Sequence, residues 1–134
     1  MKQRSIFVSL FFILTACEEP AARPAIQVKA LNTQAGIQLE VLVPPGHHAY
    51  LDAGKEGNLI PVSFRWDGSA PNLTLAPLGE FDEQVRATVL RGRGQWQFEK
   101  GAATAVTVRS QICDEKIGLC YPPSETRAML QRLH

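Results

Sequence analysis

A repeated alternation of apolar and polar residues, which begins near residue 25 and continues almost to the C-terminus, most constrains the fold. In residues 37–43 every second side chain is aliphatic, and residues 26–30 follow the same pattern. A period of two residues is typical of a strand with one face on the core and the other in water. Further runs occupy residues 59–66, 72–76, 84–90, 95–98, 104–109 and 126–133. No segment has a convincing helical repeat.

Glycine and proline separate these runs, as at Pro44-Pro45-Gly46, Asp67-Gly68 and Gly92. Seven or eight short strands at regular spacing predict an all-β fold, an antiparallel sandwich of two sheets. Only the last run, residues 124–133, is ambiguous between strand and helix. We expect residues 25–134 to form one domain, because their number suits one core and no repeat or low-complexity segment divides them.

The N-terminus has the pattern of an export signal. Lys2 and Arg4 precede an apolar stretch at residues 5–15, which is too short to span a bilayer. The next residues complete Leu14-Thr-Ala-Cys17, which resembles the lipobox of bacterial lipoproteins. We therefore expect residues 1–16 to be a lipoprotein signal peptide and Cys17 to be lipidated. An ordinary signal peptide with Cys17 as a spare thiol stays open.

A lipidated Cys17 would place the chain in the bacterial cell envelope, facing the periplasm, where a disulfide can persist. Residues 17–24 contain proline, alanine and charge, and we expect them to be an extended tether. Glu18 after the cysteine slightly favours the outer membrane, by resemblance to the sorting rule of enteric lipoproteins. Removal of Lys2 and Arg4 would leave 12 of the 14 basic residues against 13 acidic ones, a balance that argues against nucleic acid binding.

The other two cysteines, Cys113 and Cys120, form an isolated pair near the C-terminus. Gly118 between them permits a tight turn. Pro122 and Pro123 lack N–H groups, so the chain at Cys120 cannot join a ladder deep in a sheet. The sequence therefore predicts an exposed position for Cys120.

Three interpretations of this pair stay open. A structural bridge across so short a loop would contribute about 2.5 kcal/mol. Asp114 and Glu115 beside Cys113 disfavour a thiolate, which fits a structural bridge or a shuttle that reacts only when docked. A copper or zinc site with His47 or His48 is the third, although the spacing of the thiols is uncommon for ligands. Turn histidines of this kind are usually solvated.

The sequence around the cysteines resembles the active-site hairpin of the N-terminal periplasmic domain of DsbD, the thiol:disulfide interchange protein. The resemblance lies in residues 108–113 and in the run Leu-Cys-Tyr-Pro-Pro at 119–123. Residues 45–52 and 79–83 resemble two further family segments, and the similarity extends over about residues 25–133. The resemblance implies an immunoglobulin-like sandwich whose cysteines join a hairpin. Full-length family members continue into a membrane-spanning and a thioredoxin-like domain, so we expect this chain to be the N-terminal module alone.

The same resemblance implies roles for individual residues. Cys120 would attack the partner and Cys113 would resolve the mixed disulfide. Phe81 would be a cap over the pair, although as an aromatic residue it also suits the core. The expected surroundings of the active site are Glu80, Asp82, Tyr50 and Tyr121.

The resulting functional prediction is a periplasmic thiol-disulfide exchange module, a component of a protein-disulfide reductase. It would pass electrons to partner proteins through Cys113 and Cys120. The expected partners are thioredoxin-fold proteins and a membrane electron carrier. No cofactor is predicted, because Gly92-Arg-Gly94 lacks the further glycine of a dinucleotide turn. The alternative is an immunoglobulin-like lipoprotein that binds partners and carries a purely structural disulfide.

Overall fold

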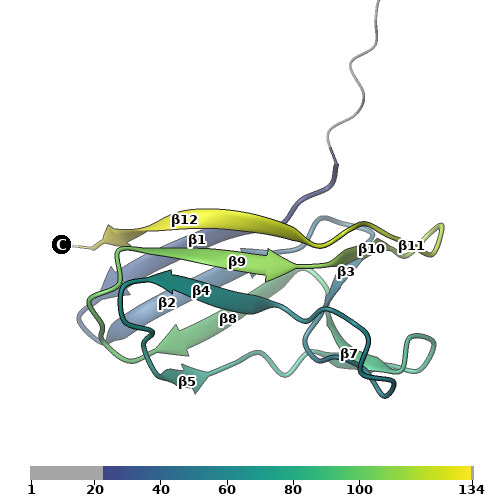
Figure 1. Cartoon of the computed structure of the whole chain (residues 1–134), viewed down its shortest axis with the longest axis horizontal. Helices are drawn as coiled ribbons and strands as arrows, with labels where there is room; N and C mark the ends of the chain where they lie inside the picture. Colours follow the sequence, from purple (N-terminus) through teal and green to yellow (C-terminus); the bar gives the residue numbers. More distant parts are fainter. Residues whose placement is uncertain (1–22, 134) are drawn as a thin grey trace, which may run out of the picture.

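The computed structural model describes residues 23–133, which form a larger β-sheet and a smaller one at its end (Figure 1). The described residues contain strands and connecting segments, which confirms the predicted all-β class and the two-sheet sandwich. None of these residues forms a helix long and apolar enough to cross a membrane. The signal peptide, Cys17 and most of the expected tether lie outside the described residues.

The larger sheet has seven strands in the order β4-β9-β12-β1-β2-β8-β5. Their bounds are β1 Gln27–Thr33, β2 Gly36–Leu42, β4 Ser63–Asp67, β5 Leu73–Leu75, β8 Arg93–Phe98, β9 Ala105–Ser110 and β12 Ser124–Arg132. The ambiguous last run is thus a strand. β12 lies between β9 and β1, and it pairs in parallel with β1. The other strand pairs are antiparallel, as expected, so β1 with β12 is the one parallel pair of strands among residues 23–133.

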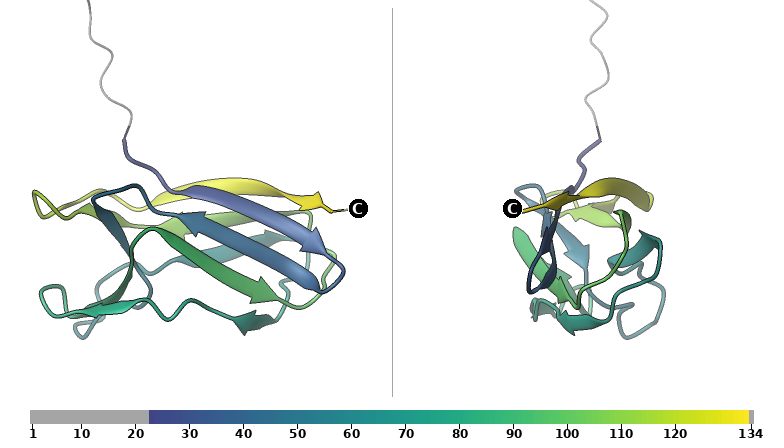
Figure 2. Two further views of the ribbon diagram at one scale, coloured as in Figure 1. Left: turned by 180° about the vertical axis from the view of Figure 1, so that it is seen from behind. Right: turned by 90° about the vertical axis from the view of Figure 1, so that its left-hand side faces the viewer.

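The smaller sheet has five strands in the order β11-β10-β3-β7-β6. Their bounds are β3 His47–Tyr50, β6 Glu80–Asp82, β7 Ala87–Leu90, β10 Ile112–Asp114 and β11 Leu119–Cys120. This sheet forms one end of the sandwich, and the β10–β11 hairpin projects from it (Figure 2).

The alternation of residues 37–43 builds the centre of the core. Ile37, Leu39, Val41 and Val43 are each at most 1% exposed, whereas Gln38 is exposed. Each fully buried aliphatic side chain contributes about 1.5–3 kcal/mol. Aromatic rings in edge-to-face contact extend this cluster, with the partners Phe64, Trp66, Trp96 and Phe98. The core gives the smaller sheet a rigid support.

The two faces of the smaller sheet have different surroundings. Ala49, Leu90 and Ile112 face the main core. The opposite face carries a second apolar cluster of Tyr50, Ala87, Val89 and Cys113, against which Leu59 and Val85 pack. Because successive residues of a strand point to opposite faces, the register decides which side chains can reach this second cluster.

Candidate functional site

Cys113 and Cys120 form a disulfide across the β10–β11 hairpin, with an S–S distance of 2.02 Å. They are directly opposite in the register, and their Cα atoms are 3.9 Å apart. Asp114 closes the loop, because its Oδ1 accepts a hydrogen bond from the backbone N–H of Lys116 at 2.8 Å. Gly118 has φ of +68°, a conformation that glycine adopts without cost.

The two sulfur-bearing residues differ in accessibility. Cys113 is 2% exposed, whereas Cys120 lies in a strand whose two residues are both exposed. Cys120 is on the edge of the sheet, and the chain leaves it at once through Tyr121, Pro122 and Pro123 toward β12. The exposed position that the prolines predicted for Cys120 is confirmed.

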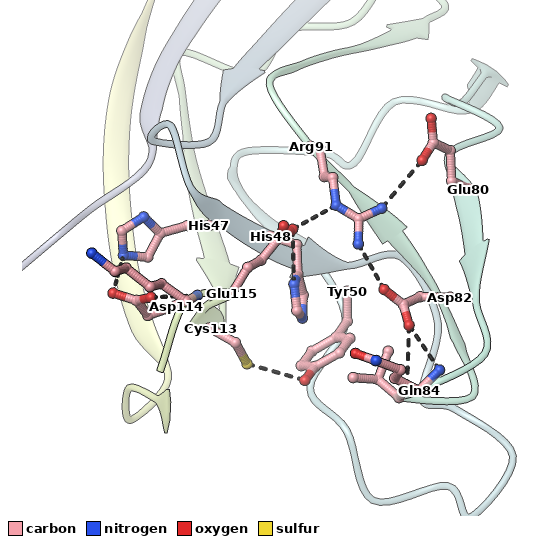
Figure 3. A network of polar contacts seen from close by, with 12 residues as sticks. His47, His48, Tyr50, Glu80, Asp82, Gln84, Arg91, Cys113, Asp114 and Glu115 are labelled. Carbon is pink, nitrogen blue, oxygen red and sulfur yellow. Dashed lines mark hydrogen bonds and ion pairs between the residues drawn. The ribbon is translucent and has the colours of Figure 1, made fainter. Parts of the chain in front are cut away.

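The strand register places a row of polar side chains on the face of Cys113. In β3, His48 is the direct neighbour of Cys113, and Tyr50 lies two residues further along on the same face. The Tyr50 hydroxyl is 3.0 Å from Cys113 Sγ and 3.5 Å from Cys120 Sγ (Figure 3). Burial, with a smaller contribution from the charge of Asp82, raises the pKa of Tyr50 above 10.0. The phenol therefore stays protonated, and its hydroxyl donates a hydrogen bond to Cys113 Sγ.

A single guanidinium, that of Arg91, joins three carboxylates beside the disulfide. Its nitrogens are 2.5 Å from Glu115 Oε1, 2.6 Å from Asp82 Oδ2 and 3.1 Å from Glu80 Oε2 (Figure 3). Hydrogen bonds from Arg91 are the main cause that lowers the pKa of Glu115 and of Asp82, and those with Glu115 and then Asp82 raise the pKa of Arg91. Arg91 thus connects the hairpin that carries the disulfide to β6.

His48 is a functional candidate that the sequence analysis raised only as a possible metal ligand. It was expected to be solvated, but it is only 5% exposed, since it occupies the same sheet face as Tyr50. Its Nδ1 is 3.2 Å from Glu115 Oε1, and its buried Nε2 has no hydrogen-bond partner. His47 points to the other face, where its ring is 2.9 Å from the Pro45 carbonyl oxygen. The alternation through residues 47–50 was the available signal.

An open pocket over the disulfide is lined by His48, Tyr50, Asp82, Arg91 and Glu115, together with Val85. A buried phenol and a buried imidazole lie beside one shielded and one accessible sulfur. Such an arrangement can hold a proton near sulfur while another molecule reaches Cys120 from solvent. Within residues 23–133, no three histidine, cysteine or acidic side chains are grouped to hold a metal ion.

No protein-family model matches the sequence, and no curated protein matches it. Among solved structures, the reduced N-terminal domain of DsbD from Neisseria meningitidis is similar, with a TM-score of 0.52 and 20% identity over 79% of this chain and 84% of that one. The chain has the fold of the DsbD N-terminal domain. A complex between the DsbD N-terminal and PilB N-terminal domains of the same organism is also similar, with a TM-score of 0.50 and 18% identity over 85% of this chain and 88% of that one. The DsbD-like, immunoglobulin-like fold implied by the sequence is thereby confirmed.

The register of this DsbD-like fold does not bring Phe81 to the disulfide. Asp82 lines the disulfide pocket, so the alternation of β6 points Phe81 to the other face. The Phe81 ring is 49% exposed, and the Lys55 ammonium lies 5.7 Å from its centroid. Phe81 is thus neither a core residue nor in contact with the pair here, and its role as a cap stays a prediction. Val85 lines the disulfide pocket instead, and it packs against the cluster that contains Cys113.

The other expected site residues have different relations to the pair. Tyr50 contacts both sulfurs, Asp82 lines the pocket, and Glu80 reaches it only through Arg91. Tyr121 packs against the main core, and its backbone N–H donates to the Ile112 carbonyl oxygen at 2.9 Å. Tyr121 therefore fixes the direction of the chain after Cys120.

Proposed function

We propose that this chain is a thiol-disulfide exchange module that passes reducing equivalents to partner proteins through Cys113 and Cys120. The observation that carries the proposal is the asymmetry of the bridge, in which an exposed Cys120 is bonded to a buried Cys113. An exchange reaction needs one sulfur that a partner can approach in line and one that is held back. The DsbD-like fold adds support.

In the proposed cycle, the reduced Cys120 thiolate attacks one sulfur of a partner disulfide. The partner's other sulfur leaves as a thiolate and takes up a proton. Cys113, as a thiolate, then attacks the Cys120 sulfur of the mixed disulfide and displaces the partner's second thiolate. Two electrons have passed to the partner, and the Cys113–Cys120 bond has formed. A dithiol donor reduces it by the reverse steps.

The charges near the pair support reaction on docking in preference to reaction with any oxidant. Arg91 is bonded to three carboxylates, so the local balance is negative despite its charge. Negative neighbours disfavour a thiolate and therefore slow attack on disulfides in solution. A partner that brings positive charge, or that covers the carboxylates, would remove part of this effect.

The partner class and the location are parts of the same proposal. We infer that the partners are thioredoxin-fold proteins and that a membrane electron carrier supplies the electrons. A complex of the similar DsbD domain with another protein domain supports a protein as the partner. We also propose a lipid anchor at Cys17 in the cell envelope, facing the periplasm. Incorporation of labelled fatty acid that disappears in Cys17→Ala would support the anchor.

The deciding experiment is a trap. Cys113→Ala in a Cys17→Ser background leaves Cys120 as the single thiol, so it should form a stable mixed disulfide with a thioredoxin-fold domain. The matched control is Cys120→Ala, which keeps only the buried Cys113 and should trap little. Mass spectrometry of the adducts measures both. Equal trapping would reverse or remove the assigned roles. A bridge that no thioredoxin-fold dithiol reduces would instead support a structural disulfide.

A further inference from the structure

We propose that His48 is the general base that takes the proton from the Cys113 thiol, so that Cys113 can resolve the mixed disulfide. This inference rests on the proposed exchange function and adds a residue to it. Cys113 is buried in the closed bridge, so the proton of its thiol would leave most directly through a neighbouring side chain. His48 is the one imidazole among the described residues that lines the disulfide pocket.

The position of His48 relative to Cys113 follows from the sheet. The two residues are direct neighbours across β3 and β10, so their side chains leave the same face. Both are buried, at 5% and 2% exposure. The His48 ring meets the Tyr50 ring edge-on at 5.3 Å between centroids, and Tyr50 in turn contacts Cys113 Sγ. Figure 3 shows this group on one side of the sheet.

Glu115 orients the imidazole for this role. Its carboxylate lies 3.2 Å from His48 Nδ1, so the neutral ring places its proton on Nδ1 and donates it to Glu115. Nε2 then carries a free lone pair, and it is buried without a partner while the disulfide is closed. A buried acceptor of this kind is satisfied when a donor forms nearby. Reduction of the bridge creates such a donor, the Cys113 thiol.

In the resolving step, one proton moves from Cys113 through His48 to the leaving thiolate. In the mixed disulfide, Cys120 is bonded to the partner and Cys113 is a thiol. Nε2 of His48 accepts the proton from Cys113 Sγ, and the Glu115 carboxylate stabilises the charged ring. The Cys113 thiolate attacks Cys120 Sγ, the bond from Cys120 to the partner breaks, and the partner leaves as a thiolate. That thiolate takes the proton from His48 directly or through water.

Several charged and polar side chains lie around His48. Arg91 Nε shares Glu115 Oε1 with the imidazole, so the carboxylate serves two cations when the ring is charged. Asp82 lines the same pocket from β6, and Tyr50 contributes a neutral phenol from β3. The charged groups that line the pocket with His48 are therefore Asp82, Asp114, Glu115 and Arg91.

The test uses the full chain in a Cys17→Ser background, reduced and then mixed with a chromogenic aromatic disulfide. The first release of coloured thiol reports attack by the first cysteine, and the second reports resolution within the protein. His48→Asn keeps a donor for Glu115 but has no basic nitrogen. We expect the second phase to slow about tenfold or more at pH 7, while the first phase changes less than about twofold. The inflection of the second phase between pH 5 and 8, where imidazole ordinarily titrates, should disappear.

His47→Asn is the matched control, because this neighbouring histidine points to the opposite face, and it should behave as the parent protein. If His48→Asn does not fold, Glu115→Gln decides. Loss of the carboxylate that orients the ring should slow the second phase, and an unchanged second phase overturns the proposal. A second phase in His48→Asn with the rate and pH profile of the parent overturns it as well. A parent protein that exchanges with no thioredoxin-fold dithiol removes the proposed function itself, which is a different result.

Discussion

The hydroxyl of Tyr50 lies beside the disulfide, 3.0 Å from Cys113 Sγ and 3.5 Å from Cys120 Sγ. Because burial keeps this phenol protonated, it is a fixed donor at the place where negative charge develops when the bridge opens. A thiolate accepts a hydrogen bond more strongly than a disulfide sulfur does. The contact therefore stabilises the reduced form more than the oxidised one.

Tyr50→Phe should make the bridge harder to reduce. Loss of a hydrogen bond worth about 0.5–1.5 kcal/mol corresponds to an equilibrium constant for reduction that falls about two- to tenfold. The decrease should be larger at alkaline pH, where a larger fraction of the reduced cysteines is thiolate, than at pH 6. Equilibration with glutathione at several pH values measures it. A decrease independent of pH would mean that the phenol acts only through packing.

Access to the dithiol should depend on Val85 more than on Phe81. Val85 packs against the cluster that contains Cys113, whereas the Phe81 ring lies beside Lys55. In the conformation described here, Val85→Ala should raise the rate at which a small disulfide oxidises the reduced pair several-fold. Phe81→Ala should leave this rate within about twofold of the parent. Faster oxidation in Phe81→Ala alone would show that β6 moves to bring Phe81 over the pair.

Arg91→Gln should weaken the response of stability to acid. Arg91 holds the pKa of Asp82 below 3.8 and that of Glu115 below 4.5. Unfolding raises both values, so the unfolded chain binds more protons in acid. This stability is fully present above about pH 5 and is lost as the pH falls below 4.5.

For the same variant we expect a loss of about 1 kcal/mol at pH 7, discounted for the exposure of the ion pairs, and little loss at pH 3. Urea unfolding at both pH values measures the difference. Arg93→Gln, which removes one surface ion pair with Glu40, is the control and should change the pH dependence less. Parallel stability curves for the parent and Arg91→Gln would contradict the prediction.

Gly79→Ala should loosen the attachment of β6. Gly79 has φ of +63°, and an added Cβ would lie 2.6 Å from the Val89 carbonyl oxygen and 2.5 Å from Leu51 Cδ1. We expect a loss of about 2 kcal/mol or more in unfolding free energy. Gly57→Ala has a similar φ of +73° with no atom within 4 Å, so it isolates the backbone term of about 1 kcal/mol. Equal losses in thermal unfolding would exclude the steric contribution.

Local alternation predicted most strands because one side of each long strand is buried in the main core, as in residues 37–43. It missed β3, β6, β10 and β11, which have four, three, three and two residues, so any alternation in them is too short to predict a strand. The last run was ambiguous because its side chains are only partly buried. Its strand conformation depends on β9 and β1, which are distant in sequence, and the parallel pair with β1 follows from the same non-local contacts.

The site was predictable where one short segment carries the chemistry. The cysteine pair and the exposed position of Cys120 were predicted from residues 113–123, and the resemblance to the DsbD family lay mainly in residues 108–123. Arg91 and His48 were not predicted as site residues, because their common partner Glu115 lies 24 and 67 residues away in the chain. The placement of Phe81 depends on the register of β6, which a single shift by one residue would reverse.

The parallel pairing of β1 with β12 also orients the whole domain. β12 begins directly after the cysteine hairpin, so the chain enters β1 at the disulfide end, and the C-terminus leaves at the opposite end (Figure 2). An anchor on the residues before β1 would therefore keep the disulfide end of the domain close to the surface that holds the anchor. With an attachment at Cys17, the stretch 17–24 would have a reach of about 27 Å when fully extended. A partner protein would have to approach the disulfide parallel to that surface. The length of residues 17–24 would therefore limit the size of the partners that can reach Cys120.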